Sequence, residues 1–295
     1  MHGLDTEHGK LMRGTPNACG PAPLNQAWRM VFPGASFPRT FQMQNHFVLE
    51  ICVESVACAV AAQRGGAHRI ELCSDLPTGG ITPSAGLMTV ARKHLRLPIH
   101  VIIRPRSGDF VYSAPEFEIM KDDIRTAKQL GMNGVVLGLL DDNGNVDVER
   151  TKRLVDLAHP LPVTFHRAFD VSGDLEEALE SVIQTGAQRI LTAGGRLSAP
   201  EHLVGLAQLV KAAASRIAIM PGGGINARNV VRILRRTSAR EIHTSLGASA
   251  PPFSSHHGST RLNGAGNHGA HRLLALEENV RTLMGLVAGM VQGPG

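Results

Sequence analysis

Short apolar segments alternate with helical segments along this chain from residue 46 onward. Each apolar segment has the length of a buried strand, roughly five to eight residues. Eight of them occur, and they span residues 46–53, 69–74, 98–105, 134–140, 162–169, 189–195, 217–224 and 240–247. Strands that alternate with helices form parallel βαβ units, so the pattern predicts an α/β fold with a parallel sheet.

Two architectures accommodate repeats of this kind: an open, doubly wound sheet and a closed barrel. An open sheet commonly carries a GxGxxG turn after its first strand, and no such turn follows residues 46–53. A (β/α)8 barrel uses eight repeats, and the 295 residues of the chain exceed the roughly 250 that it needs. We therefore expect a (β/α)8 TIM barrel that forms a single domain.

Residues that start and stop helices mark several of the connecting segments. Ser55 and Asp174 are expected N-caps, because their side-chain oxygens can accept hydrogen bonds from the free N–H groups of a first turn. Gly131 and Gly186 are expected to end helices, because glycine adopts the left-handed conformation that terminates them. The expected helical segments are 55–66, 115–131, 174–186, 198–215, 226–238 and 271–291.

Two segments fall outside the alternating pattern. Residues 1–45 contain no long apolar core and include Asp5 and Glu7, so we expect a disordered tail rather than a transit peptide. Residues 248–271 are rich in Ser, Gly and His and are expected to be a flexible insertion in a barrel domain that covers residues 46–290. The histidines of this insertion are either metal ligands or incidental members of a solvated loop; they are His256, His257, His268 and His271.

Composition argues against several classes of partner. The formal net charge is +5, but Lys and Arg are scattered, and one Trp and one Tyr offer little for base stacking, so no nucleic-acid partner is expected. No stretch approaches the roughly 18 consecutive apolar residues of a membrane span, so no membrane partner is expected. None of the four cysteines forms a CxxC pair, which argues against a structural zinc site and favours reduced thiols.

Two strand segments carry a carboxylate and a thiol where a buried strand should be wholly apolar. Glu50 and Cys52 are two residues apart in the first segment, and Glu71 and Cys73 repeat this spacing in the second. Residues at this spacing share one face of a strand. Functional residues of such barrels lie at the carboxyl ends of the strands, so we expect all four side chains to point inward at that end.

Arginines and histidines of the same inward parity follow on other strands. Arg104 lies near the end of the third segment and Arg106 directly follows it, His166 lies in the fifth and His243 in the eighth. One interpretation is a salt-bridge lattice in which both arginines neutralise Glu50 and Glu71, because buried charges need partners. The other is a pocket, since the histidines add titratable groups at the same end of the barrel.

The pocket interpretation leads to an enzyme that acts on a small anionic or phosphorylated substrate. Arg104 and Arg106 would bind the anion, and His166 would act as acid or base with one of the two strand carboxylates opposite it. Gly222, Gly223 and Gly224 after the seventh strand either seat a phosphate on their N–H groups or form a tight turn. No lysine falls on a strand, which disfavours Schiff-base chemistry.

The two strand thiols suggest a different chemistry. Neighbouring strands lie about 4.8 Å apart, so the sulfurs of Cys52 and Cys73 can approach each other. Two soft thiolates suit Cu(I) better than Ca²⁺, Mg²⁺ or Mn²⁺. The alternative is that both cysteines act only as small apolar residues in the core.

Five motifs in order resemble those of the CutC copper homeostasis proteins. They are "LEICVES", "GGAHRIELCSDLPTGGITPS", "IIRPRSGDFVYS", "PVTFHRAFD" and "MPGGGI", and the resemblance extends from Phe47 to Leu246. It implies a (β/α)8 barrel, a cytoplasmic location, self-association into a homo-oligomer and a role in copper homeostasis. The Cu(I)-binding cysteines proposed for this family match Cys52 and Cys73, so copper is the expected metal.

Overall fold

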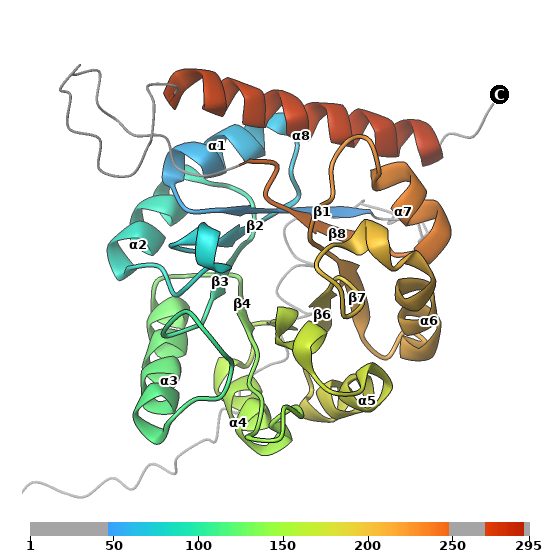
Figure 1. Cartoon of the computed structure of the whole chain (residues 1–295). Helices are drawn as coiled ribbons and strands as arrows, with labels where there is room; N and C mark the ends of the chain where they lie inside the picture. Colours follow the sequence, from blue (N-terminus) through green and yellow to red (C-terminus); the bar gives the residue numbers. More distant parts are fainter. Residues whose placement is uncertain (1–46, 248–268, 292–295) are drawn as a thin grey trace, which may run out of the picture. The chain divides into compact units, whose positions relative to one another are not determined.

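The computed structural model describes residues 47–247 and 269–291, and its centre is a barrel of parallel strands (Figure 1). The strands pair in the order β7-β6-β5-β4-β3-β2-β1-β8, and β7 and β8 lie beside each other at the seam. The predicted TIM barrel is confirmed, with each strand inside its predicted segment. The strands are β1 Val48–Val53, β2 Arg69–Leu72, β3 Ile99–Ile102, β4 Gly134–Leu137, β5 Val163–Phe165, β6 Arg189–Thr192, β7 Ala218–Pro221 and β8 Glu241–Thr244.

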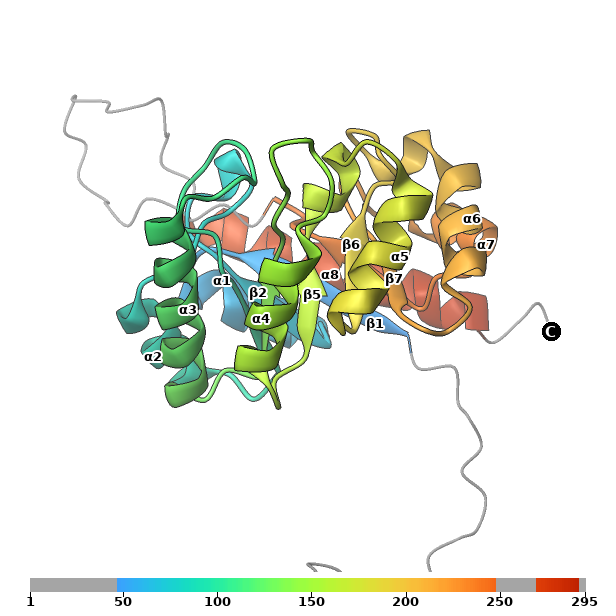
Figure 2. The same ribbon diagram turned by 90° about the horizontal axis from the view of Figure 1, so that it is seen from below.

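Helices form the outer layer around the strands (Figures 1 and 2). They are α1 Val56–Gly65, α2 Ala85–His94, α3 Ala114–Gln129, α4 Val148–Ala158, α5 Leu175–Thr185, α6 Leu203–Ala213, α7 Val230–Thr237 and α8 Gly269–Val291. Short 3₁₀ helices follow three strands; they are η2 Leu76–Thr78, η3 Arg167–Val171 and η4 Ala199–Glu201. The alternation of strand and helix is therefore continuous from β1 to α8.

The predicted helix boundaries are confirmed where a capping residue marks them. The Ser55 side chain accepts the Cys58 N–H at the start of α1, and Asp174 caps α5 in the same way. Gly186 ends α5 with a φ of 83°, a left-handed conformation that favours glycine. Gly131 also has a positive φ and lies just beyond the end of α3.

Two predictions concern residues that the structure describes in part or leaves out. The predicted tail, residues 1–45, lies outside the described residues, as do residues 248–268 of the predicted insertion. The remainder of that insertion is helical, because α8 begins at Gly269. Of the described helices, none is both long and apolar enough to cross a bilayer.

Helix α8 closes the outer layer by packing along α1 (Figure 1). Its buried residues recur at the three- and four-residue spacing of one helix face, which is the pattern of an amphipathic helix on a core. They are Leu276, Val280, Leu283 and Val287. Helix α8 therefore covers α1, the helix that directly follows β1.

A layer of buried charges fills the inside of the barrel below the carboxyl ends of the strands. Arg69 on β2 forms ion pairs with Glu50 on β1 and with Glu241 on β8, at 2.7 Å for the latter. Arg189 on β6 also pairs with Glu241. A salt-bridge lattice therefore exists, but the predicted partners, Arg104 and Arg106, were wrong. Arg69 and Arg189 pair with the acids instead, because they begin their strands and meet the acids inside the barrel. Arg104 lies beyond β3 and has other contacts.

Candidate metal centre

The thiols of Cys52 and Cys73 meet at the carboxyl ends of β1 and β2. Cys52 lies in β1 and Cys73 follows β2 directly, and their Sγ atoms are 3.5 Å apart. Both side chains are buried, and both are free thiols. Ile102 and Val136, from the next two strands, pack against them in a small apolar cluster. The sequence-predicted approach of the two sulfurs is confirmed.

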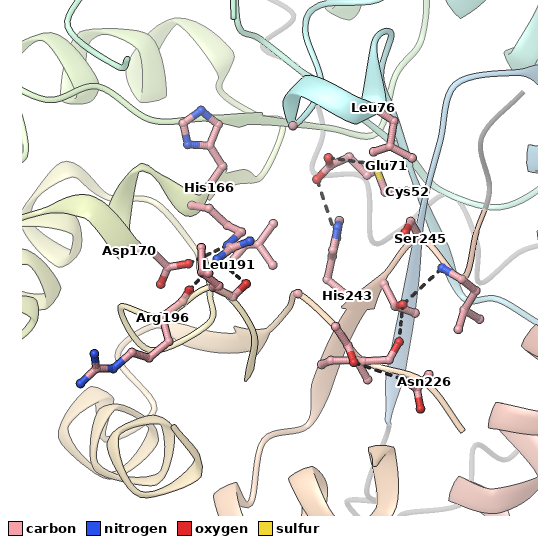
Figure 3. Close-up of a pocket in the computed structure, with 18 of the residues that line it drawn as sticks. Cys52, Glu71, Leu76, His166, Asp170, Leu191, Arg196, Asn226, His243 and Ser245 are labelled. Carbon is pink, nitrogen blue, oxygen red and sulfur yellow. Dashed lines mark hydrogen bonds and ion pairs between the residues drawn. The ribbon is translucent and has the colours of Figure 1, made fainter. Parts of the chain in front are cut away.

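Glu71 and His243 lie beside Cys52 and bring an oxygen and a nitrogen close to its sulfur (Figure 3). Cys52 and Glu71 are register partners on adjacent strands, and Cys52 Sγ lies 3.4 Å from Glu71 Oε1. Glu71 Oε2 lies 3.9 Å from His243 Nδ1. The donor atoms of Cys52, Glu71 and His243 all lie within 4.8 Å of one another. Three strands, β1, β2 and β8, thus bring a sulfur, an oxygen and a nitrogen donor close together.

Glu50 fixes the orientation of the His243 ring from below. Its Oε1 lies 2.8 Å from His243 Nδ1, and its other oxygen pairs with Arg69. Burial would raise the pKa of Glu50, but Arg69 and His243 outweigh it and hold this pKa below the usual range. An ionised Glu50 accepts the Nδ1–H of His243, so Nε2 is the ring nitrogen that is left to act as a donor atom when the ring is neutral. Metal-binding histidines commonly have such a carboxylate behind them.

Burial and neighbouring charged groups shift the side chains of this site toward their protonated forms. Burial raises the pKa of Glu71, and the nearby Glu50 carboxylate adds to this shift. The hydrogen bond with Cys73, burial and the Glu71 carboxylate together raise the pKa of the Cys52 thiol. Burial lowers the pKa of His243, but Glu71 and Glu50 outweigh it, so the net shift is upward. The site therefore favours protonated groups until a cation replaces their protons.

These donors line the wall of a pocket of about 1210 Å³ that the loops at the carboxyl ends of the strands enclose. Cys52, Glu71 and His243 form one side, and loops after β5, β6 and β7 supply much of the rest (Figure 3). An ion held by the three donors would be reachable from this pocket. The predicted pocket is present in addition to the salt-bridge lattice, so neither interpretation excluded the other.

The two predicted anion-binding arginines have different positions. Arg104 lines the pocket, but its Nη1 donates to the carbonyls of Thr78 and Gly80 and its Nη2 to that of Gly108. Arg106 is not among the lining residues and pairs with Glu116 at 2.6 Å and with nearby backbone carbonyls. Anion binding by these two side chains stays a prediction that their contacts do not favour.

His166 is a neutral hydrogen-bond donor in this arrangement. The N–H of Ala168 donates to its Nδ1 at 3.2 Å, which places the ring proton on Nε2. Burial and the charge of Arg104 lower the pKa of His166 to about 3. A neutral ring that carries its proton on Nε2 cannot accept a proton there. The predicted acid or base role of His166 therefore has no support in these contacts.

The glycine loop after β7 forms the tight turn that was one of its two interpretations. Gly223 and Gly224 have φ values of 87° and 69°, and Gly222 N donates to Thr192 O at 2.9 Å. Gly223 and Gly224 also line the pocket, so phosphate binding by their N–H groups stays a prediction.

The sequence placed His243 at the correct end of the barrel but did not identify it as a possible ligand. Its partners Glu50 and Glu71 are 193 and 172 positions away, and only the strand register brings them together. The register pairs Glu50 with His243 across β1 and β8. The available signal was the predicted barrel itself, because closure places the eighth strand beside the first.

Comparison with known proteins is consistent with this geometry. Residues 47–248 match the model of the CutC family. The "Copper homeostasis protein cutC homolog" of Mus musculus is 50% identical over 205 residues, which cover 70% of this chain and 75% of the relative. A "family protein CutC" of Chromobacterium violaceum is 48% identical over 67% of this chain and 80% of its own.

Solved structures give the same picture. The crystal structure of the putative copper homeostasis protein CutC from Streptococcus agalactiae matches with a TM-score of 0.65 and 34% identity, and the match covers 68% of this chain and 98% of that one. A thiamine phosphate pyrophosphorylase from Pyrococcus furiosus matches with a TM-score of 0.52 and 18% identity, covering 83% and 98% of the two chains. The second likeness concerns the fold alone.

Proposed function

Because this chain belongs to the CutC family, whose members include copper homeostasis proteins, we propose that it binds Cu(I) through the thiolates of Cys52 and Cys73. The observation that carries the proposal is the 3.5 Å separation of the two buried sulfurs. Metal–sulfur bonds are roughly 2.3 Å long, the value for zinc, so both sulfurs can reach one ion. Thiolates are soft ligands, which favours Cu(I) over hard cations.

The surroundings of the thiols support a transient Cu(I) site. Ile102 and Val136 shield the sulfurs on one side, while Cys52 borders the pocket through which an ion would enter and leave. Thiols in this role must stay reduced, so a cytoplasmic location is part of the proposal. Self-association into a homo-oligomer is likewise proposed on the family resemblance.

Cu(I) affinity should increase as pH rises. The metal binds the thiolate, and the pKa of Cys52 lies above its usual range, so Cu(I) displaces at least this proton at neutral pH. We expect the affinity to increase at least about 10-fold per pH unit between about pH 6 and pH 8. Competition with a chromogenic Cu(I) chelator under anaerobic conditions, corrected for protonation of the chelator, measures this slope. An affinity that does not change with pH would exclude Cys52 as a thiolate ligand.

We propose as a second function that the pocket binds a small anionic or phosphorylated ligand. Within the described part of the chain, the N–H groups of Gly223 and Gly224 have no hydrogen-bond acceptor. Arg167 Nη1 lies 3.3 Å from the point that a Cβ on Gly223 would occupy, and both residues line the pocket. Its other guanidinium nitrogens contact Asp170 and the carbonyl of Arg196. These donors form an anion-binding concavity of the kind that successive backbone N–H groups provide.

Inorganic phosphate should therefore raise the thermal unfolding midpoint of the wild type. We expect the increase to be lost in Arg167→Ala, because one charged donor of the concavity disappears. Arg106→Ala is the matched control, since Arg106 is an arginine outside the pocket lining, and it should retain the wild-type increase. The measurement is differential scanning fluorimetry with sodium chloride at equal ionic strength as reference. Equal shifts in both variants would rule out the proposed anion site.

A further inference from the structure

We propose that the ligand of the anion site is a phosphorylated polyol or sugar, whose oxygens are bound by His166 and Glu71. This inference rests on the proposed anion-binding function and deepens it, because it names the class of the ligand. The phosphate lies against the N–H groups of Gly223 and Gly224, and the polyol or sugar part extends into the rest of the pocket. A bare phosphate ion would need neither His166 nor Glu71.

The pocket is much larger than a phosphate group. Its volume of about 1210 Å³ is slightly above the range of roughly 300–1,000 Å³ that is typical of small-molecule sites. Gly223 and Gly224 follow β7, whereas Glu71 lies on β2 and His166 follows β5. Figure 3 shows Glu71 and His166 on different walls of the pocket. A ligand bound at the glycine loop therefore has room for a body that reaches these walls.

Buried polar atoms without a hydrogen-bond partner are concentrated at this pocket. Among the residues that the structure describes, six side-chain atoms are of this kind, and three of them belong to residues that line the pocket: Glu71, Arg104 and His166. Each of these three residues is at most 5% exposed. A buried polar group without a partner costs free energy, because it has lost water and gained nothing in return. A polar ligand in the pocket would supply the missing partners.

His166 offers a hydrogen-bond donor to this ligand. Its Nδ1 accepts the N–H of Ala168 at 3.2 Å, so the ring proton lies on Nε2. A side chain on Gly138 would collide with the Nδ1 edge of the ring, so this edge lies against the end of β4. Nε2, at the tip of the ring, is the polar atom that is left for a ligand. Burial and the charge of Arg104 lower the pKa of His166 to about 3, and an uncharged N–H donor suits a hydroxyl or carbonyl oxygen.

Glu71 offers a hydrogen-bond acceptor on another wall. Its Oε1 contacts Cys52 Sγ at 3.4 Å, and its Oε2 lies 3.9 Å from His243 Nδ1, which is too far for a hydrogen bond. A hydroxyl group both donates and accepts hydrogen bonds, so the hydroxyls of one polyol can satisfy the Glu71 acceptor and the His166 donor. An alkyl chain satisfies neither group, and an ammonium group satisfies only Glu71. Phosphate at one end and hydroxyls along the body are therefore the chemistry that fits.

The test compares two phosphorylated probes with five carbons each, ribose 5-phosphate and pentyl phosphate, with inorganic phosphate as the reference. Isothermal titration calorimetry measures their affinities for the wild type. Both probes are phosphate monoesters, but only the sugar carries oxygens along its carbons. We expect ribose 5-phosphate to bind at least about 10-fold more tightly than pentyl phosphate, because two buried groups gain hydrogen bonds with the sugar and gain none with the alkyl chain.

His166→Asn and Glu71→Leu test the two contacts separately. Asparagine can still accept the N–H of Ala168 but has no donor at the position of Nε2, and leucine has nearly the size of Glu71 without a polar atom. Each variant should lose most of the preference for ribose 5-phosphate and bind inorganic phosphate as the wild type does. His100→Asn is the matched control, because His100 is also buried with an unpartnered ring nitrogen but does not line the pocket. Its preference should equal that of the wild type.

The comparison of probes on the wild type decides the inference even if a variant does not fold. Equal affinities, or tighter binding of pentyl phosphate, would overturn the inference and leave the anion site in place as long as inorganic phosphate binds. If neither inorganic phosphate nor either probe binds, the proposed anion function fails and the inference fails with it. A wild-type preference in both folded variants would also overturn the inference, because other residues would then bind the sugar.

Discussion

Replacing Cys52 and Cys73 together with serine should abolish stoichiometric Cu(I) binding. The hydroxyl group is a hard, weakly acidic donor, so neither serine can replace a soft thiolate. We expect the apparent Cu(I) affinity to fall at least about 100-fold, because the loss of even a supporting group around a metal costs up to that amount. The measurement is an anaerobic Cu(I) titration against a chromogenic chelator. Both sulfurs are buried, so circular dichroism should accompany it to confirm folding.

The matched control is Cys58→Ser. Cys58 is also a buried free thiol, but it lies on α1 and belongs to the main core rather than to the cluster around the two sulfurs. This variant should bind one Cu(I) with wild-type affinity. Unchanged binding by the double variant, or equal losses in the double variant and Cys58→Ser, would refute the assignment of the two strand-end thiols.

Replacing Arg69 with alanine should destabilise the barrel by about 3–5 kcal/mol, the cost of leaving buried charges without a partner. Arg69 is the ion-pair partner of both Glu50 and Glu241 inside the barrel, and its side chain is 8% exposed. Glu50 is fully buried, so it would keep only His243 as an opposing group. Urea unfolding followed by circular dichroism measures the change in the free energy of unfolding.

Arg281→Ala provides the control for this prediction. Arg281 also pairs with two carboxylates, those of Glu277 and Glu278, but its side chain is 54% exposed on α8. Exposed pairs contribute little to stability, so the unfolding midpoint should not change measurably. A similar loss of unfolding free energy in both variants would contradict the prediction. It would show that removing an arginine side chain is costly for a reason other than charge burial.

The fold could be predicted from the sequence because its signals are local. Each buried strand is a run of apolar residues, and Ser55, Asp174 and Gly186 mark helix ends within a few positions. Helices α2 and α4 carry weaker signals, since their C-cap residues are Leu95 and His159 rather than a glycine. Eight strands then require closure, and closure places the carboxyl ends of the strands together.

The candidate site could be predicted only in part. The parity of Cys52 and Cys73 in neighbouring strands was sufficient to bring the thiols together. The partner of Glu50 was not predictable in this way, because the Glu50–Arg69 pair depends on register between strands rather than on spacing within one. The donors also form no CxxC motif, because register between strands rather than spacing within one strand brings them together. Donors that come from β1, β2 and β8 have no common sequence spacing, so a metal site built from them leaves no local motif.

Copper K-edge X-ray absorption of the wild type loaded with one equivalent of Cu(I) tests the central claim most directly. The claim is that Cys52 and Cys73 hold the ion between them at the side of the pocket that Cys52 lines. We expect a first shell dominated by two sulfur atoms at about 2.3 Å, the metal–sulfur distance of thiolate sites, and the loss of this shell in the double serine variant. A first shell of nitrogen and oxygen alone in the wild type would contradict the account.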